Sequence, residues 1–320
     1  MSILGIDQVT YGASDLAACR QCFIDWGLAL LIDDGQQLVF ESLNGCRVVV
    51  ADPVQVVLPR AIEDGPTLRE VVWGVQSSED LDRLRPLLAA QPGYRDEWHR
   101  IGCTDPMGLA VCFQVSTKRV LTAADASGGQ VNNWHERSRI NAAGKFYDRA
   151  RPVEVGHVVL FTPELTAMEA FYSSLGFVTS DRYPGRGAFM RCAPRGGHHD
   201  LFLLQTPDGK RGLNHVAFSV RDIHEVFGGG LHFSRCGGAT QLGPGRHPVS
   251  SAYFWYFKCP AGGLIEYYAD DDELTEDWVP RSFEPGPTVF AEWAIDGGID
   301  GHTRRQKGVA ADGKFLSDKR

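Results

Sequence analysis

The stretches IDQVTYGASDLAACRQCFIDWGLAL at residues 6–30 and VGHVVLFTPELTAMEAFYSSLGFVT at residues 155–179 share one pattern. Each begins with an apolar strand, passes through a turn with an acidic residue into an amphipathic helix, and then reaches a glycine. Gln8 precedes Gly27 by 19 residues, and His157 precedes Gly176 by the same 19 residues. The pattern indicates that the chain consists of two similar halves.

Two further pairs of segments extend the match between the halves. LREVVWGV from Leu68 matches LNHVAFSV from Leu213, and DPMGLAVCF from Asp105 matches CPAGGLIEYY from Cys259 through a shared Pro-x-Gly turn followed by a strand. Each half therefore contains two units of strand, helix and several strands, which predicts an α+β fold. The predicted helices are 14–24, 78–89, 164–174 and 222–230. The predicted strands include 37–42, 46–51, 186–192 and 199–205.

The repeat also suggests the limits of the domains. Residues 1–115 form the N-terminal domain, and residues 152–270 form the C-terminal domain. Residues 116–151 contain ADASGGQVNN and fit neither half, so they are interpreted as the linker. Residues 271–320, rich in Pro, Gly and charge, are interpreted as a tail.

Composition excludes several classes of protein. With 320 residues, 43% of them apolar and 22% charged, the chain can fold as a globular protein of about two domains. A net charge of −8 argues against a nucleic-acid partner. No apolar run is long enough for a membrane span and no signal segment opens the chain, so we expect a cytoplasmic protein without a membrane partner. The eight scattered cysteines suit a reducing compartment.

The two halves differ at three equivalent positions. The N-terminal half has Gln8, Glu70 and Cys112 where the C-terminal half has His157, His215 and Glu266. A buried glutamate is costly unless it is paired or bound to a cation. Two imidazoles and one carboxylate on one face suit a divalent metal of the middle of the first transition series. We therefore predict a metal site in the C-terminal half that holds Fe(II), with Mn(II) as a possible alternative.

The motifs around these residues resemble those of the type I extradiol dioxygenases of the vicinal oxygen chelate superfamily, over about residues 1–270. The resemblance implies four βαβββ modules in two domains, with mixed sheets curled into half barrels. It also implies a C-terminal metal centre, a homo-oligomer, and a reaction in which O2 is inserted into a catechol-type aromatic diol with meta cleavage of the ring.

Three more residues carry this resemblance. His199, in HHDLFLL, matches the acid/base histidine of the family. His247 precedes Glu266 by 19 residues and Tyr256 precedes it by 10, which are spacings similar to those of the family's second histidine and its substrate-facing tyrosine. The resemblance implies that His199, His247 and Tyr256 are catalytic. Each of them also has a structural interpretation, such as a solvated turn for the His198–His199 pair.

The sequence departs from the family after His247, where Pro248 and Val249 replace a polar stretch, so the substrate is in doubt more than the reaction type. Two other functions stay open. A glyoxalase-like isomerase or lyase would take metal ligands from both halves, including Glu or Gln from each. Gln8 and Glu70 in the N-terminal half are residues of this kind, so this alternative stays open. A metal-free ligand-binding protein of the same fold would leave Glu266 without a partner.

Overall fold

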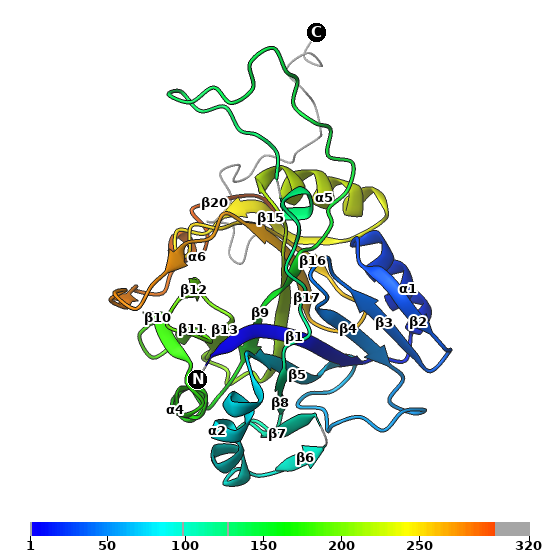
Figure 1. Ribbon diagram of the computed structural model, residues 1–320, viewed down its shortest axis with the longest axis vertical. Helices are drawn as coiled ribbons and strands as arrows, with labels where there is room; N and C mark the ends of the chain where they lie inside the picture. The colour runs from blue at the N-terminus through cyan, green and yellow to red at the C-terminus, as the bar shows by residue number, and fades with distance from the viewer. Residues whose placement is uncertain (1, 98, 127, 298–320) are drawn as a thin grey trace.

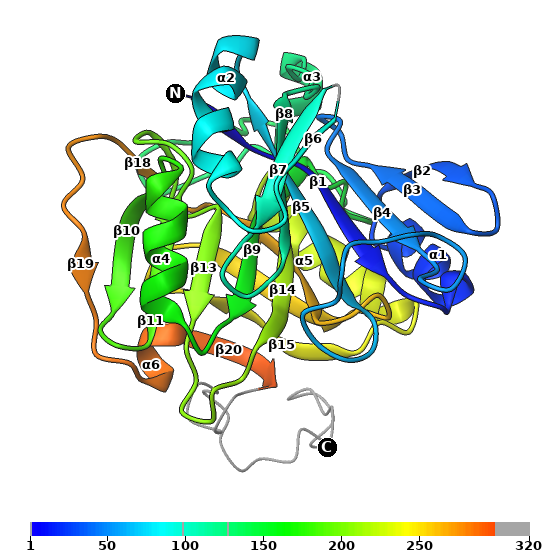
Figure 2. The same cartoon turned by 90° about the horizontal axis from the view of Figure 1, so that it is seen from below.

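The computed structural model describes residues 2–97, 99–126 and 128–297. The strands of these residues form two large mixed sheets, which Figures 1 and 2 show packed side by side. The first sheet has the order β2-β3-β4-β1-β5-β8-β7-β6. Its strands are β1 (Ile3–Gly12), β2 (Ala29–Asp33), β3 (Gln37–Glu41), β4 (Arg47–Ala51), β5 (Thr67–Val75), β6 (Arg95–Glu97), β7 (Arg100–Thr104) and β8 (Ala110–Val115).

The second sheet has the order β19-β10-β11-β13-β9-β14-β17-β16-β15-β20 and curls around the centre of Figure 1. Its strands are β9 (Glu154–Phe161), β10 (Val178–Tyr183), β11 (Gly187–Arg191), β13 (Leu201–Leu204), β14 (Gly212–Ser219), β15 (Thr240–Arg246), β16 (Tyr253–Lys258), β17 (Leu264–Ala269), β19 (Arg281–Ser282) and β20 (Trp293–Gly297). A short ribbon pairs β12 (Gly196–Gly197) with β18 (Glu273–Leu274).

Each large sheet is built from two βαβββ modules. The first strand of a module pairs in parallel with the last strand of that module, as β1 does with β4 and β14 with β17. It pairs antiparallel with the first strand of the neighbouring module, as β1 does with β5 and β9 with β14. This arrangement confirms the predicted α+β fold. The module helices are α1 (Leu16–Asp25), α2 (Ser78–Ala89), α4 (Leu165–Ser174) and α5 (Ile223–Arg235).

Helix α5 continues five residues beyond the predicted end at residue 230. Gly229 and Gly230 do not end the helix, because they allow it to pack closely against neighbouring residues. A Cβ atom on Gly230 would overlap the indole of Trp255 on β16, and one on Gly229 would overlap Ala150. The loss of intrinsic helix stability at these glycines is therefore offset by the approach of the helix to the sheet.

The strand register repeats between the halves. In the first sheet, Val72 pairs with both Gln8 and Cys112. In the second sheet, Ala217 pairs in the same way with both His157 and Glu266. The equivalence that the sequence repeat indicated for these positions is therefore a property of the folded sheets as well.

The two halves share one hydrophobic core. Trp26, at the end of α1, is fully buried and stacks on Tyr267 of β17 with ring centroids 3.5 Å apart. Across the same junction, Asn44 donates a hydrogen bond to Glu154 over 2.9 Å. Because apolar contacts of this kind hold elements in fixed relative positions, the N-terminal half braces the C-terminal sheet. The limits of the two domains stay predictions.

The predicted linker and tail differ in structure. Residues 116–151 contain the short helix α3 (Ala123–Ala126) and a long loop that projects at the top of Figure 1. Part of the predicted tail joins the fold, since β18, β19, α6 (Pro287–Phe290) and β20 pack on or pair with the second half. Residues 298–320 lie outside the described residues.

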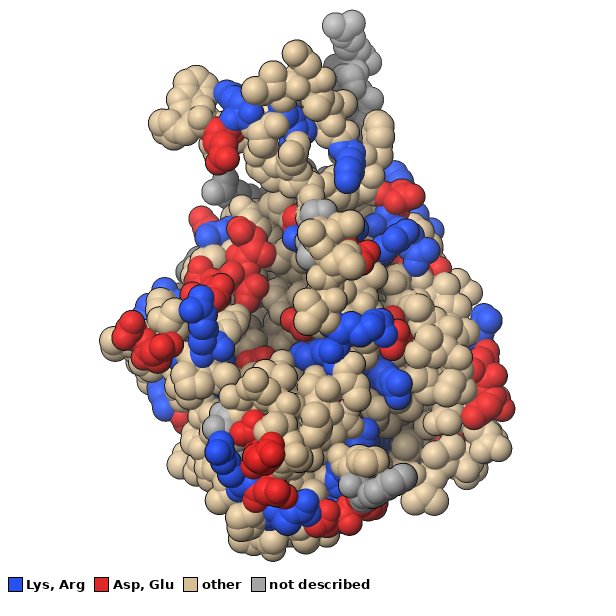
Figure 3. Space-filling model, viewed as in Figure 1, with Lys and Arg blue, Asp and Glu red and all other residues tan. Residues whose placement is uncertain are grey.

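No helix in the described part of the chain is long and apolar enough to cross a membrane. On the face shown in Figure 3, basic and acidic side chains are interspersed, and the surface is hollowed near its centre.

Candidate active site

A pocket of about 650 Å³ opens inside the second sheet. Its walls are mainly apolar, and the rings of Phe189 and Phe202 stack there with centroids 3.9 Å apart. All six residues that the sequence analysis singled out line this one pocket: His157, His199, His215, His247, Tyr256 and Glu266. The structure therefore brings together every candidate site residue, although they come from four strands and two loops.

The three candidate metal ligands meet at one point. His157 lies on β9, His215 on β14 and Glu266 on β17, and all three are buried. The Nε2 atom of His157 is 3.2 Å from that of His215 and 3.1 Å from Oε2 of Glu266. The Nε2 atom of His215 is also 3.1 Å from Oε2 of Glu266. The three donor atoms thus form a nearly equilateral triangle.

This triangle fits a divalent metal ion. First-row metals bind such donors at about 2.0–2.2 Å, so two ligands at right angles stand about 3 Å apart. Three mutually adjacent ligands occupy one face of an octahedron and leave the opposite face for other molecules. Lone pairs that converge on one point repel one another unless a cation lies among them. The donor set and its spacing therefore suit a metal with open coordination positions.

Asn214 orients one of these ligands, and the sequence analysis did not single it out. Nδ1 of His215 lies 2.8 Å from Oδ1 of Asn214. An amide oxygen only accepts hydrogen bonds, so Nδ1 carries the hydrogen and Nε2 presents its lone pair to the triangle. Its place directly before a candidate ligand in the strand is the sequence signal for Asn214.

The electrostatics of the triangle favour a neutral His157 and an ionised Glu266. Burial by itself would raise the pKa of Glu266, but the neighbouring His157, His215 and His247 hold that pKa well below its usual range. Burial lowers the pKa of His157, although Glu266 opposes the shift. These are the protonation states in which the side chains bind metals.

His199 faces the triangle and is held from behind by a chain of hydrogen bonds. Its ring centroid is 4.2 Å from that of His157, and its Nδ1 is 3.1 Å from Nδ1 of His198. His198 is fully buried, so the solvated turn considered above is wrong for this residue. Nε2 of His198 lies 2.9 Å from Asp181, which also accepts hydrogen bonds from Arg281. The chain runs from Arg281 through Asp181 and His198 to His199.

Burial, together with the neighbouring His157 and His198, lowers the pKa of His199 well below its usual value. If the neutral His198 donates from Nε2 to Asp181, its Nδ1 accepts the Nδ1 hydrogen of His199. That arrangement leaves the Nε2 lone pair of His199 free to accept a proton. The His198–Asp181 pair thus supports an acid/base tautomer of His199.

His247 and Tyr256 form a second hydrogen-bonded pair in the pocket. Nδ1 of His247 donates to the carbonyl oxygen of Phe290 over 2.6 Å, and its Nε2 is 3.0 Å from the hydroxyl of Tyr256. Nε2 of His247 is also 3.6 Å from Oε1 of Glu266. Phe290 belongs to the predicted tail, which therefore positions a candidate site residue. Val249, at the departure from the family pattern, lines the apolar wall.

The equivalent position in the first sheet holds an ion-pair cluster. Glu70 accepts hydrogen bonds from Arg95 over 2.5 Å and from Arg100 over 3.1 Å, and Arg95 also contacts Sγ of Cys112. Two guanidinium groups thus neutralise the carboxylate in this half. Glu70 and Gln8 line a separate pocket of about 460 Å³ and do not reach the triangle of His157.

Comparisons with known proteins agree with this architecture. Residues 154–267 match the model of the Glyoxalase/Bleomycin resistance protein/Dioxygenase superfamily. The chain is 31% identical over 218 residues to metapyrocatechase 2 of Cupriavidus necator, a match that covers 65% of this chain and 64% of that protein. The match thus spans slightly less than two thirds of the relative's length.

Solved structures of similar fold include a glyoxalase and several dioxygenases. The Mn(II)-bound glyoxalase from Novosphingobium aromaticivorans has a TM-score of 0.71 at 23% identity, covering 98% of this chain and 99% of that one. A halotolerant catechol dioxygenase, BphC, has a TM-score of 0.71 at 18% identity, covering 92% and 95%. Homoprotocatechuate 2,3-dioxygenase from Brevibacterium fuscum, in complex with 3,4-dihydroxyphenylacetate, has a TM-score of 0.66 at 20% identity, covering 93% and 91%.

At these identities the solved structures show the fold and not the chemistry. The matched family model covers the half of the chain that holds the triangle of donors. Residues 154–267 therefore form a domain of the Glyoxalase/Bleomycin resistance protein/Dioxygenase superfamily, and the chain has the vicinal oxygen chelate fold.

Proposed function

We propose that this protein is an extradiol ring-cleavage dioxygenase that inserts O2 into a catechol-type diol at a non-haem Fe(II) centre. His157, His215 and Glu266 would hold the metal, and the same donors would also bind Mn(II). The observation that carries the proposal is the triangle of donor atoms, 3.1–3.2 Å apart, beside His199 in an apolar pocket. Similarity to metapyrocatechase 2 supports the choice of a dioxygenase within the superfamily.

The chemistry that a divalent metal supplies in such a site is chelation of the diol, stabilisation of its anionic form and transfer of electrons. The protein side chains do the remaining work. His199 would accept a proton from a diol hydroxyl at Nε2 and return it later, with His198 and Asp181 holding its ring in place. The Tyr256–His247 pair would orient the diol oxygens by hydrogen bonds. The apolar walls exclude water from the reacting ring.

The pocket supports a substrate with an apolar ring. Its volume of about 650 Å³ exceeds what a single catechol ring needs, and the stacked pair Phe189–Phe202 lies in its wall. The resemblance also implies a homo-oligomer. The exposed apolar side chains of the linker, among them Trp134 and Phe146, support that part of the proposal.

Metal content and ring cleavage test the proposed function together. The full chain is purified without oxygen, its bound metal is counted, and Fe(II) or Mn(II) is restored before air and a panel of alkyl and aryl catechols are added. We expect one metal ion per chain in the triangle and a yellow ring-opened product. Isomerisation of the glutathione adduct of methylglyoxal without ring cleavage would instead identify a glyoxalase. Ligand binding without any metal would identify a binding protein.

Replacing Asn214 with leucine is expected to weaken metal binding about 10–100-fold, because His215 then loses the partner that fixes its tautomer. Asn214→Asp keeps an acceptor at this position and is expected to retain most of the affinity. Competitive titration with a metal-binding dye measures both variants. Equal affinity of Asn214→Leu and the parent protein would show that His215 does not depend on this hydrogen bond.

Replacing Tyr256 with phenylalanine is expected to lower kcat/KM for the diol roughly 10–100-fold, the typical effect of removing one hydrogen bond to a charged group. Metal content should stay unchanged, since the Tyr256 hydroxyl is not one of the three donors. Tyr253→Phe is a matched control, because Tyr253 lies on the same strand and does not line the pocket. If both variants react like the parent, Tyr256 does not position the substrate.

A further inference from the structure

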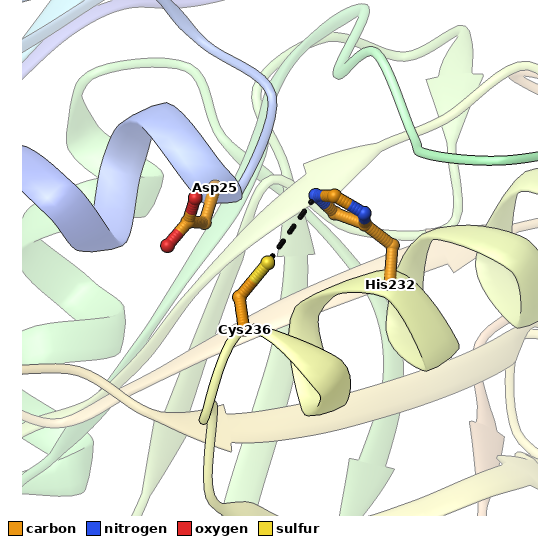
Figure 4. A group of neighbouring side chains, drawn as sticks. All are labelled: Asp25, His232 and Cys236. Carbon is orange, nitrogen blue, oxygen red and sulfur yellow. Dashed lines mark hydrogen bonds between the residues drawn. The ribbon is translucent and has the colours of Figure 1, made fainter.

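A second group of potential metal ligands lies where the two halves meet. Asp25 is the last residue of α1, and His232 and Cys236 lie one turn apart at the end of α5. One donor atom from each side chain lies within 4.8 Å of the other two. Figure 4 shows the thiol of Cys236 facing the His232 ring, with Asp25 on its other side. None of the three residues lines the pocket described above.

The distance between the two α5 donors fits a shared tetrahedral ion. Nε2 of His232 is 3.5 Å from Sγ of Cys236. Zinc binds imidazole nitrogen at about 2.0–2.1 Å and thiolate sulfur at about 2.3 Å, so a tetrahedral angle places the two donors about 3.6 Å apart. The helix produces this spacing, because side chains four residues apart lie on the same face. The backbone N–H of Cys236 still donates to the carbonyl oxygen of His232, over 3.0 Å.

Packing between the halves fixes the third residue. Trp26 follows Asp25 directly, and its indole lies edge-on to Phe233 of α5 with centroids 5.0 Å apart. The hydroxyl of Tyr267 donates to the backbone carbonyl oxygen of Trp26 over 2.6 Å. Phe233 follows His232 in the same helix, so this contact sets the position of Asp25 relative to the α5 donors. Preorganisation of this kind lowers the entropy cost of binding an ion.

Polar neighbours also support a site at this position. Nε2 of Gln21 donates to both carboxylate oxygens of Asp25, each over 3.0 Å, and metal-binding carboxylates are commonly oriented by such partners. Two lone-pair sites of the carboxylate are then still available. Cys236 is exposed, so an ion can enter from solvent and a water molecule can complete its coordination.

We propose that Asp25, His232 and Cys236 form a zinc site that ties α1 of the N-terminal half to α5 of the C-terminal half. Binding of Zn²⁺ releases the thiol proton of Cys236 to solvent. The resulting thiolate and the Asp25 carboxylate balance the two charges of the ion, and His232 binds as a neutral ligand. The thiolate makes this donor set softer than two imidazoles and a carboxylate, so it favours zinc over Fe(II) or Mn(II).

Zinc binding to the full chain in the Glu266→Gln background tests this proposal, since that change disables the pocket triangle and leaves the second site intact. With Zn²⁺ alone as the probe, we expect one equivalent to bind. Adding Cys236→Ser or His232→Ala should weaken the binding by more than the roughly 10–100-fold that loss of a ligand's hydrogen-bond partner costs. His224→Ala is the matched control, because His224 lies on the same helix and packs on Tyr147.

Two further measurements do not depend on zinc counting. Co²⁺ should give a thiolate-to-metal absorption band that persists with His224→Ala and disappears with Cys236→Ser. In the Glu266→Gln background, zinc at about 100 times its Kd should raise Tm by roughly 5 °C, but not when Cys236→Ser is added. Equal zinc affinity with and without Cys236, or a cobalt complex without the thiolate band, would overturn the proposal. Ring cleavage by the Cys236→Ser variant of the otherwise unchanged chain should be unaffected.

Discussion

Replacement of His199 with alanine is expected to lower kcat for ring cleavage by roughly 10²–10⁴-fold, the typical contribution of one general acid/base group. The ring of His199 lies 4.2 Å from that of His157, but its nitrogens are outside the triangle of donors. The variant should therefore lose turnover far more than it loses metal. Steady-state kinetics on the metal-reconstituted protein, with metal content measured on the same sample, check this result.

One companion variant and one rescue experiment separate proton transfer from packing. Asp181→Asn keeps the size of the side chain but weakens the support of His198, so it should lower kcat less than His199→Ala and leave KM nearly unchanged. Free imidazole in the buffer should restore part of the activity of His199→Ala, because it can enter the vacated space. Turnover equal to that of the parent protein in His199→Ala would remove this residue from the mechanism.

The second large effect is expected at the triangle itself. Glu266→Gln preserves the shape of the side chain but removes its negative charge, so metal affinity should fall more than about 100-fold and ring cleavage with it. Equilibrium dialysis against Fe(II) without oxygen, or against Mn(II), measures the loss. Glu266 is almost fully buried, and its Oε2 lies 3.1 Å from Nε2 of His215.

The matched control for this experiment lies in the other half of the repeat. Glu70 stands where the C-terminal half has His215, and it is paired with Arg95 and Arg100. Glu70→Gln should cost stability by leaving these cations without their partner, but metal content should not change. If Glu70→Gln lost the metal and Glu266→Gln kept it, ligands from both halves would be required. That result would favour the glyoxalase-like alternative.

Most of the architecture could be predicted from the sequence. The α+β class, the duplication and the approximate limits of α1, α2 and α4 follow from hydrophobic periodicity and from the repeat. The three candidate ligands were found because the halves share one strand register, so a difference at an equivalent position stood out. The end of α5 could not be predicted, because packing of Gly230 against Trp255 overrides its low helix propensity.

The chain's own residue pattern determined the fold and pointed to His157, His215 and Glu266, because strand alternation, helix periodicity and register are set by the local geometry of the backbone. His199, His247 and Tyr256 were indicated by the resemblance to a known family. The tertiary structure alone decided which residues support them. Asp181 reaches His198 across 17 positions of the chain, and the carbonyl of Phe290 reaches His247 across 43. The meeting of Asp25 with His232 and Cys236 is of the same kind. Such contacts depend on how distant segments pack, and no sequence period encodes that packing.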